Sequence, residues 1–188
     1  MEIININTLP TCGLHGCRLH DARYSIYVFD LDPEEVFRRT CNRSMVYVRR
    51  KGVDDPNLVI GKDSRDFFDD HLDMALAELQ MLFSRFQRAE DITAPDGKIY
   101  DTAGDEVEFN PWIKDTETGC YQVSIILNKV NDMTVVAALT PLVVDFLVKF
   151  ILQEFYGDED FKAASAKQRI VDNLNYQGQQ VKLKTSPF

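Results

Sequence analysis

The chain has 188 residues, of which 45% are hydrophobic and 27% charged, a globular composition that excludes global disorder. Its formal net charge of −9 argues against a general nucleic-acid binder, which would need a basic surface. Because no charged segment followed by an apolar one marks a secretory signal, we expect reduced thiols at Cys12, Cys17, Cys41 and Cys120.

The first third of the chain predicts short elements. Residues 1–22 have the pattern of an extended arm followed by a loop. Tyr24–Phe29 is β-branched and aromatic and predicts a strand. Asp32 is a suitable N-cap before a proline, which predicts a short helix over Pro33–Asn42. Met45–Arg50 carries a second strand signal.

A long helix is predicted over Lys62–Glu90, where apolar residues recur at helical spacing over about five turns. The residues on this apolar face are Phe68, Leu72, Ala75, Leu79, Leu82, Phe83 and Phe86. Polar residues 91–119 then predict a long loop, with a possible hairpin whose arms fall near Lys98–Tyr100 and Glu106–Phe109. Cys120–Leu127 is the clearest strand.

Helix signals resume at Asp132 and continue to Tyr156. Pro141 leaves two alternatives, because it either kinks one continuous helix or begins a new helix that Thr140 caps. A last helix is predicted over Asp160–Tyr176, and residues 177–188 have the composition of an extended tail.

These elements predict an α+β fold in which three main helices pack with a small, mostly antiparallel sheet, and in which both termini are extended. We expect one domain over residues 23–176, with an arm at 1–22 and a tail at 177–188. The expected core residues are Phe68, Leu72, Leu79, Leu82, Phe86, Ile125, Leu142, Phe146, Phe150 and Ile151.

Charge is unevenly distributed along the chain. Residues 53–119 contain 6 basic and 17 acidic side chains and so carry a net charge of −11. Residues 1–52 contain 8 basic and 6 acidic side chains, and residues 120–188 contain 7 of each. The acidic middle third indicates an ordinary solvated surface or a surface that repels nucleic acid passing nearby.

Two groups of side chains have metal-ligand chemistry. Cys12, His15, Cys17 and His20 fall within nine residues, but zinc sites usually use ligand pairs on separate elements, so we expect no metal here. Four aspartates, Asp66, Asp69, Asp70 and Asp73, share one face of the first long helix. They could hold a hard cation, although a solvated helix start has the same pattern.

No local motif of nucleotide binding or hydrolysis occurs in the sequence, so we predict no catalytic residue and no cofactor. The alternative is a small enzyme or metal-dependent module that uses the Asp66–Asp73 face or the Cys12–His20 cluster. A basic cluster at Arg49, Arg50 and Lys51, with Arg38, Arg39 and Arg43 nearby, suits phosphate contacts or pairing with acidic neighbours.

The predicted helix that ends at Tyr156 is apolar on nearly every side and must therefore be buried on nearly every side. Thr140, Pro141, Asp145 and Lys149 interrupt Val135–Ile151, so the segment is a poor transmembrane span and we expect no membrane association. We therefore expect the helix and the chain ends to contact neighbouring subunits. The candidate interface residues are Leu142, Phe146, Phe150, Phe155, Tyr156, Val181, Leu183 and Phe188.

The order of elements after Ser44 carries a resemblance. A strand with the sequence YQVSIIL leads through a polar break to an apolar helix with the sequence LVVDFLVKFILQEFY, and a helix with Ala163, Ala164 and Ala166 and a polar tail follow. Over about Ser44–Phe188 this pattern resembles small virion proteins of tailed bacteriophages that infect Bacteroides-type hosts, including neck or connector ring proteins of crAss-like phages.

The resemblance implies a structural subunit of a phage head–tail connector or neck ring, located in the virion. Its partners would be portal, neck or tail subunits and other copies of the chain, with DNA only passing through a lumen. Asp66, Asp69, Asp70 and Asp73 are the candidate lumen residues, because a negative wall does not hold phosphates. The Cys12–His20 loop lies outside the resemblance.

Overall fold

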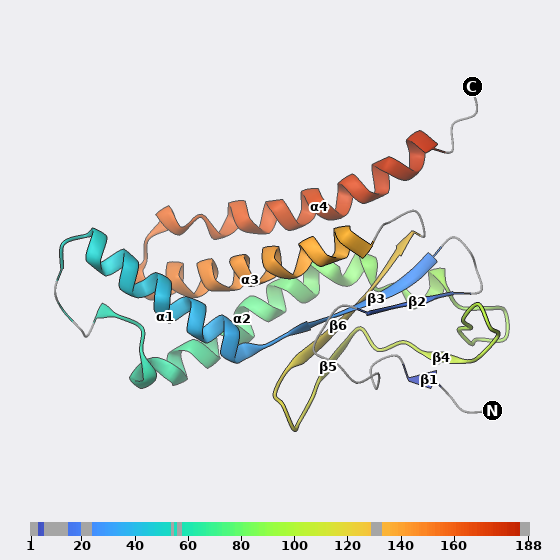
Figure 1. The fold of residues 1–188 in the computed structure, drawn as a ribbon, viewed down its shortest axis with the longest axis horizontal. Coiled ribbons are helices and arrows are strands. Elements are labelled where there is room, and N and C mark those ends of the chain that lie inside the picture. The colour runs from blue at the N-terminus through green and yellow to red at the C-terminus, as the bar shows by residue number, and fades with distance from the viewer. Residues whose placement is uncertain are drawn as a thin grey trace. The chain divides into compact units, whose positions relative to one another are not determined.

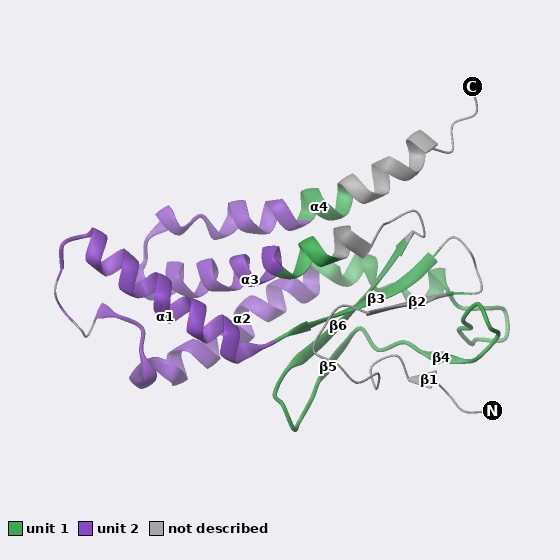
Figure 2. Ribbon diagram, viewed as in Figure 1, with its two compact units in different colours: residues 1–31, 82–140, 171–188 green, residues 32–81, 141–170 purple. Residues whose placement is uncertain are grey.

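The computed structural model describes residues 4–5, 15–19, 24–53, 55, 58–128 and 133–184 (Figure 1). In this part of the chain, four α-helices and two sheets give the predicted α+β class. The chain divides into two compact units (Figure 2). Unit 1 comprises residues 1–31, 82–140 and 171–188, and unit 2 comprises residues 32–81 and 141–170.

Unit 1 contains a four-stranded antiparallel sheet in the order β2-β3-β6-β5. Its two central strands, β3 (Tyr24–Leu31) and β6 (Tyr121–Asn128), pair over their full length and confirm the two strongest strand predictions. The edge strands are β2 (His15–Arg18) and β5 (Trp112–Lys114). A separate parallel pair joins β1 (Ile4–Asn5) to β4 (Val107–Glu108).

One face of this sheet carries a compact apolar cluster. Its buried members are Leu19, Ile26, Val28, Ile92, Ile99, Val107 and Ile126. The predicted hairpin supplies two of them, because Tyr100 pairs with Glu106 in an antiparallel bridge and the Val107 amide donates to the Ile99 carbonyl at 2.9 Å. The hairpin prediction is therefore confirmed.

Unit 2 begins with helix α1 (Pro33–Arg50). The Asp32 carboxylate accepts a hydrogen bond from the Glu34 amide at 2.9 Å, and Pro33 occupies the first helical position, as the sequence predicts. A stripe of buried residues then follows at intervals of four: Val36, Thr40, Ser44 and Val48. This stripe continues the helix to Arg50, so the predicted strand at Met45–Arg50 is wrong.

The other helices are α2 (Arg65–Phe83), α3 (Met133–Tyr156) and α4 (Ala163–Lys184). Short 3₁₀ turns lie at Lys62–Ser64, Ser84–Phe86, Ala89–Asp91 and Glu159–Phe161. In unit 2 the start of α2 lies against α1, since the Phe37 and Phe68 rings are 4.9 Å apart and Arg65 pairs with Glu34 at 2.7 Å.

Several predicted bounds change. The helix predicted over Lys62–Glu90 is interrupted, because only Arg65–Phe83 is α-helical. The predicted loop at 12–22 contains β2, and the predicted loop at 91–119 contains β4 and β5. Helix α4 continues to Lys184, so the extended tail predicted from residue 177 is wrong as far as Lys184, and residues 185–188 lie outside the described residues.

The two alternatives at Pro141 are resolved. Helix α3 is a single helix with Pro141 inside it, and this proline is exposed. Of the predicted core residues, six are buried: Phe68, Leu72, Leu79, Ile125, Phe146 and Ile151. The other four, Leu82, Phe86, Leu142 and Phe150, are half-buried.

Candidate functional site

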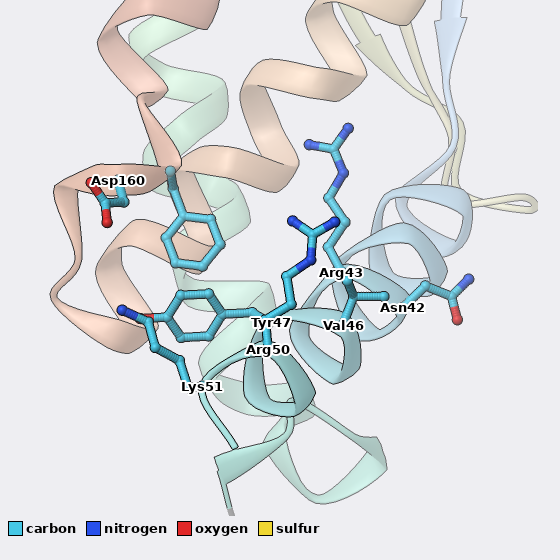
Figure 3. Close-up of a pocket in the computed structure, with 8 residues that line it drawn as sticks. Asn42, Arg43, Val46, Tyr47, Arg50, Lys51 and Asp160 are labelled. Carbon is cyan, nitrogen blue, oxygen red and sulfur yellow. The ribbon is translucent and has the colours of Figure 1, made fainter. Parts of the chain in front are cut away.

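A hollow of about 630 Å³ lies in unit 2, between the second half of α1 and the 3₁₀ turn at Glu159–Phe161 (Figure 3). The residues that line it are Asn42, Arg43, Val46, Tyr47, Arg50, Lys51, Asp160 and Phe161. Figure 3 shows the side chains of Arg43 and Arg50 extending in the same direction from α1. The hollow therefore combines an apolar and aromatic surface with three cations and one carboxylate.

Aromatic rings form the base of the hollow. The Tyr47 ring lies 4.5 Å from the Tyr156 ring and 4.8 Å from the Phe161 ring, measured between centroids. Tyr156 and Phe161 are stacked with an interplanar angle of 17°. Rings held at these distances provide a rigid apolar surface against which another side chain can pack.

A series of hydrogen bonds through Ser44 and Tyr156 holds this aromatic base in place. The Ser44 hydroxyl accepts from the Ile60 amide at 2.7 Å and donates to the Tyr156 hydroxyl, which in turn donates to the Leu58 carbonyl at 2.6 Å. Ser44 is fully buried, and burial raises the pKa of Tyr156. A small hydroxyl inside α1 thus ties the segment after α1 to the end of α3.

Ion pairs and hydrogen bonds set the charges at the rim. The Tyr47 hydroxyl donates to the Asp158 carboxylate, and this hydrogen bond is the main cause that lowers the pKa of Asp158. Lys51 lies 3.7 Å from the same carboxylate. Arg43 pairs with Asp145 at 2.7 Å, whereas Arg50 forms no ion pair with any described residue. Arg50 is therefore the cation at the rim that is most available to a partner.

This arrangement has the chemistry of a binding surface. The nearest nucleophile on α1, Cys41, is half-buried, and burial raises the pKa of its thiol, which disfavours the reactive thiolate. An apolar base beside the guanidinium group of Arg50, which forms no ion pair with a described residue, favours an apolar side chain accompanied by a carboxylate. The hollow is therefore a surface on which a side chain can dock, and it is called the docking hollow.

The sequence-predicted metal candidates do not gather at this hollow. Asp66, Asp69, Asp70 and Asp73 lie on the exposed side of α2, and Asp69 pairs with Arg65 at 3.0 Å. In the described ranges, no group of three or more histidine, cysteine, aspartate or glutamate residues could hold a metal ion. The Cys12–His20 cluster cannot be placed, because Cys12, His20 and the side chains of His15 and Cys17 lie outside the described residues.

The interface candidates on α3 are mostly covered by the chain itself. Phe146 is 2% exposed, and Leu142, Phe150, Phe155 and Tyr156 are half-buried. The apolar residues of α3 that are buried are Leu139, Val143, Val144, Phe146, Leu147, Val148, Ile151 and Leu152. The expectation that α3 needs another subunit to cover it is therefore wrong for these residues. The side chains of Val181, Leu183 and Phe188 lie outside the described residues.

The exposed apolar surface lies elsewhere in unit 2. Large apolar side chains are exposed at six described positions: Met45 (39%), Val46 (48%), Val53 (41%), Leu58 (42%), Met74 (52%) and Met81 (66%). All six fall between residues 45 and 81. Sequence reasoning missed Met45 and Val46 because it placed them in a strand. In α1, every fourth residue from Val36 to Val48 is buried, and Met45 and Val46 therefore point to the opposite, exposed side.

Comparisons of this chain with protein-family models, with curated proteins and with solved structures find no match. None of the helices in the described part of the chain combines the length and the apolar character that a membrane crossing requires.

Proposed function

We propose that the protein is a structural subunit without enzymatic activity that assembles into a closed oligomer, as in the neck or head–tail connector rings of tailed phages. The observation that carries the proposal is the concentration of exposed large apolar side chains between residues 45 and 81. These side chains lie on α1, on α2 and on the segment that joins them, and large exposed apolar side chains mark protein interfaces where they form a patch.

The docking hollow supports the same proposal. Its aromatic base is rigid and its rim is cationic, and interfaces concentrate aromatic and arginine side chains at their centres. In this proposal the partners are other copies of the chain and portal, neck or tail subunits, and the protein resides in the virion. The acidic Asp54–Glu117 region faces the solvent or a lumen through which DNA passes.

The mass of the purified protein in solution tests the assembly role. In light scattering during size-exclusion chromatography, the mass should rise with protein concentration to a plateau at a fixed multiple of 21.6 kDa. A strictly monomeric protein at high concentration, alone and mixed with the products of neighbouring genes, would contradict the proposal. Portal, terminase or tail genes beside its own gene, and its presence in purified virions by mass spectrometry, test the phage assignment.

A further inference from the structure

Two exposed helix faces of unit 2 carry opposite charges. The exposed side chains of α1 from residue 38 to residue 50 are Arg38, Arg39, Asn42, Arg43, Met45, Val46, Arg49 and Arg50. The exposed side chains of α2 include Asp66, Asp69, Asp70, Asp73, Met74, Ala77, Gln80 and Met81. Each face thus combines charges of one sign with large apolar side chains, and the two signs are opposite.

Only some of the charged side chains on these two faces form ion pairs within the chain. On α1, Glu35 binds Arg38 and Arg39, and Asp145 binds Arg43. Arg49 and Arg50 form no ion pair with any residue in the described ranges. On α2, Asp69 binds Arg65, whereas Asp66 and Asp70 form no ion pair within those ranges. Two cations on one face and two anions on the other therefore remain for an external partner.

The spacing between an apolar and a charged residue is the same on the two helix faces. Val46 and Arg50 are four residues apart on α1, and Asp70 and Met74 are four residues apart on α2, so each pair is separated by about 6 Å along its helix. When two such helices lie antiparallel, the apolar residues face each other and the charged residues face each other at the same time.

We propose that α1 of one copy binds α2 of a second copy in an antiparallel contact, with Arg50 opposite Asp70 and Val46 opposite Met74. This inference rests on the proposed assembly role and specifies its surface, and it places Asp70 in the contact between copies and not among the residues that face the lumen. Val46 and Arg50 also line the hollow, so Met74 of the second copy lies at the rim of the aromatic base. The contact joins different faces, and head-to-tail contacts of this kind generate a ring when the rotation between copies closes.

A nucleic acid is the competing partner for the arginines of α1. Phosphate contacts would leave Met45 and Val46, which are 39% and 48% exposed between those arginines, without an apolar partner. The net charge of −9 also opposes approach to a polyanion. A second copy satisfies the cations and the apolar side chains together, and for this reason it is the occupant that the observations favour.

Charge reversal on each face tests the contact. Sedimentation velocity should show that Arg50→Glu weakens self-association by about tenfold or more, and that Asp70→Arg does the same, because each places like charges opposite each other. The double variant Arg50→Glu/Asp70→Arg should regain association. An equimolar mixture of the two single variants should associate as well, although each dissociates alone.

Arg88→Glu is the matched control, since this arginine is also exposed (62%) and lies in unit 1. It should leave association unchanged, and circular dichroism should show that every variant is folded. If either single variant does not fold, Val46→Asp and Met74→Asp replace the charge reversals and should weaken association in the same way.

The outcomes separate this inference from the proposed function. Wild-type oligomers that neither reversal weakens would overturn the α1–α2 contact but keep the assembly role. Single-variant losses that the double variant does not restore would also overturn it, and so would an Arg50→Glu variant that loses only binding to duplex DNA. A monomeric wild-type protein would overturn both proposals.

Discussion

Asp145 is a carboxylate on α3 that three cations of unit 2 surround. Arg43 lies 2.7 Å from it, Lys149 2.9 Å and Arg169 4.0 Å. Its side chain is only 18% exposed. Burial alone would raise the pKa of this carboxyl, but the hydrogen bonds from Lys149 and Arg43 outweigh burial and lower the pKa below its usual value. The charged form of Asp145 therefore stabilises unit 2.

Replacing Asp145 by asparagine should change the acid dependence of stability. A carboxyl whose pKa is lower in the folded state contributes stability above its unfolded pKa of about 3.9, and this stability is lost as the pH falls through the folded pKa. Asp145→Asn should therefore cost about 1–2 kcal/mol at pH 7 and progressively less below about pH 4. Urea denaturation at several pH values measures this.

Glu90→Gln is a suitable control for Asp145→Asn, because the Glu90 side chain is 81% exposed and its distance to Arg88 is 3.8 Å. It should change stability by less than about 0.5 kcal/mol at every pH. A constant loss of stability for Asp145→Asn from pH 7 to pH 2 would show that the ionised carboxyl is not the stabilising group.

Phe146 is the buried aromatic side chain nearest to Asp145 in the sequence. It is 2% exposed, and its ring lies 5.9 Å from that of Phe150. Phe146→Ala should lower the free energy of unfolding by about 3–5 kcal/mol, since it removes buried surface and leaves a cavity. Val53→Ala, at a position that is 41% exposed, should cost less than about 0.5 kcal/mol. Equal losses in chemical denaturation would contradict the core assignment of Phe146.

At the scale of elements, α1 explains why part of the fold could not be read from the sequence. Its buried stripe contains Thr40 and Ser44, and these polar residues conceal the helical period of the apolar ones. The Thr40 hydroxyl donates to the Val36 carbonyl at 2.8 Å, and Ser44 bonds Ile60 and Tyr156. The local β-propensity of Met45–Arg50 was therefore overridden by partners that are distant in sequence.

Strands β3 and β6 were predictable because their signal is local. Both are rich in β-branched and aromatic residues, and both are buried over most of their length. Strand β5 was not predictable, since it has three residues and is defined by its pairing with β6. The docking hollow could not be predicted either, because Phe161 and Tyr47 are far apart in the sequence and meet only in the folded chain.

Gln87 holds the β5 edge of the sheet in unit 1. Its amide nitrogen donates to the Ser124 carbonyl at 2.8 Å and to the Pro111 carbonyl at 3.2 Å, and its oxygen accepts from the Trp112 indole at 3.1 Å. One side chain thus joins Pro111 and Trp112, at the start of β5, to Ser124 in β6.

Gln87→Glu should destabilise the protein by about 1–3 kcal/mol, because a carboxylate cannot donate to the two carbonyl groups. Trp112 is the only tryptophan, so its fluorescence reports both unfolding and the local change. Gln80→Glu, at an exposed position of α2, is the control and should have little effect. An unchanged midpoint and an unchanged emission maximum for Gln87→Glu would contradict the role of this amide.

At the scale of the whole molecule, the apolar sequence of a helix does not show whether the same chain or another subunit buries it. Composition correctly indicated that α3 is buried, and Val143, Leu147 and Ile151 are each 0% exposed. Sequence alone could not distinguish cover by the same chain from cover by a neighbour. In the structure, the large exposed apolar side chains of unit 2 lie on α1, on α2 and on the segment between them, and not on α3.

The C-terminal segment provides the last test of assembly. The part of α4 whose burial the structure describes has four buried residues, Ala163, Ala166, Ile170 and Leu174. Deleting residues 177–188 spares them, so the melting temperature of the monomer should change by no more than a few degrees. If this segment reaches another subunit, as we propose for the assembly, deletion should raise the dissociation constant of the oligomer by about tenfold or more, equivalent to about 1.4 kcal/mol. Sedimentation velocity and thermal denaturation on the same samples measure the two effects. A deletion that lowers the melting temperature but leaves the dissociation constant unchanged would assign this segment to folding and not to assembly.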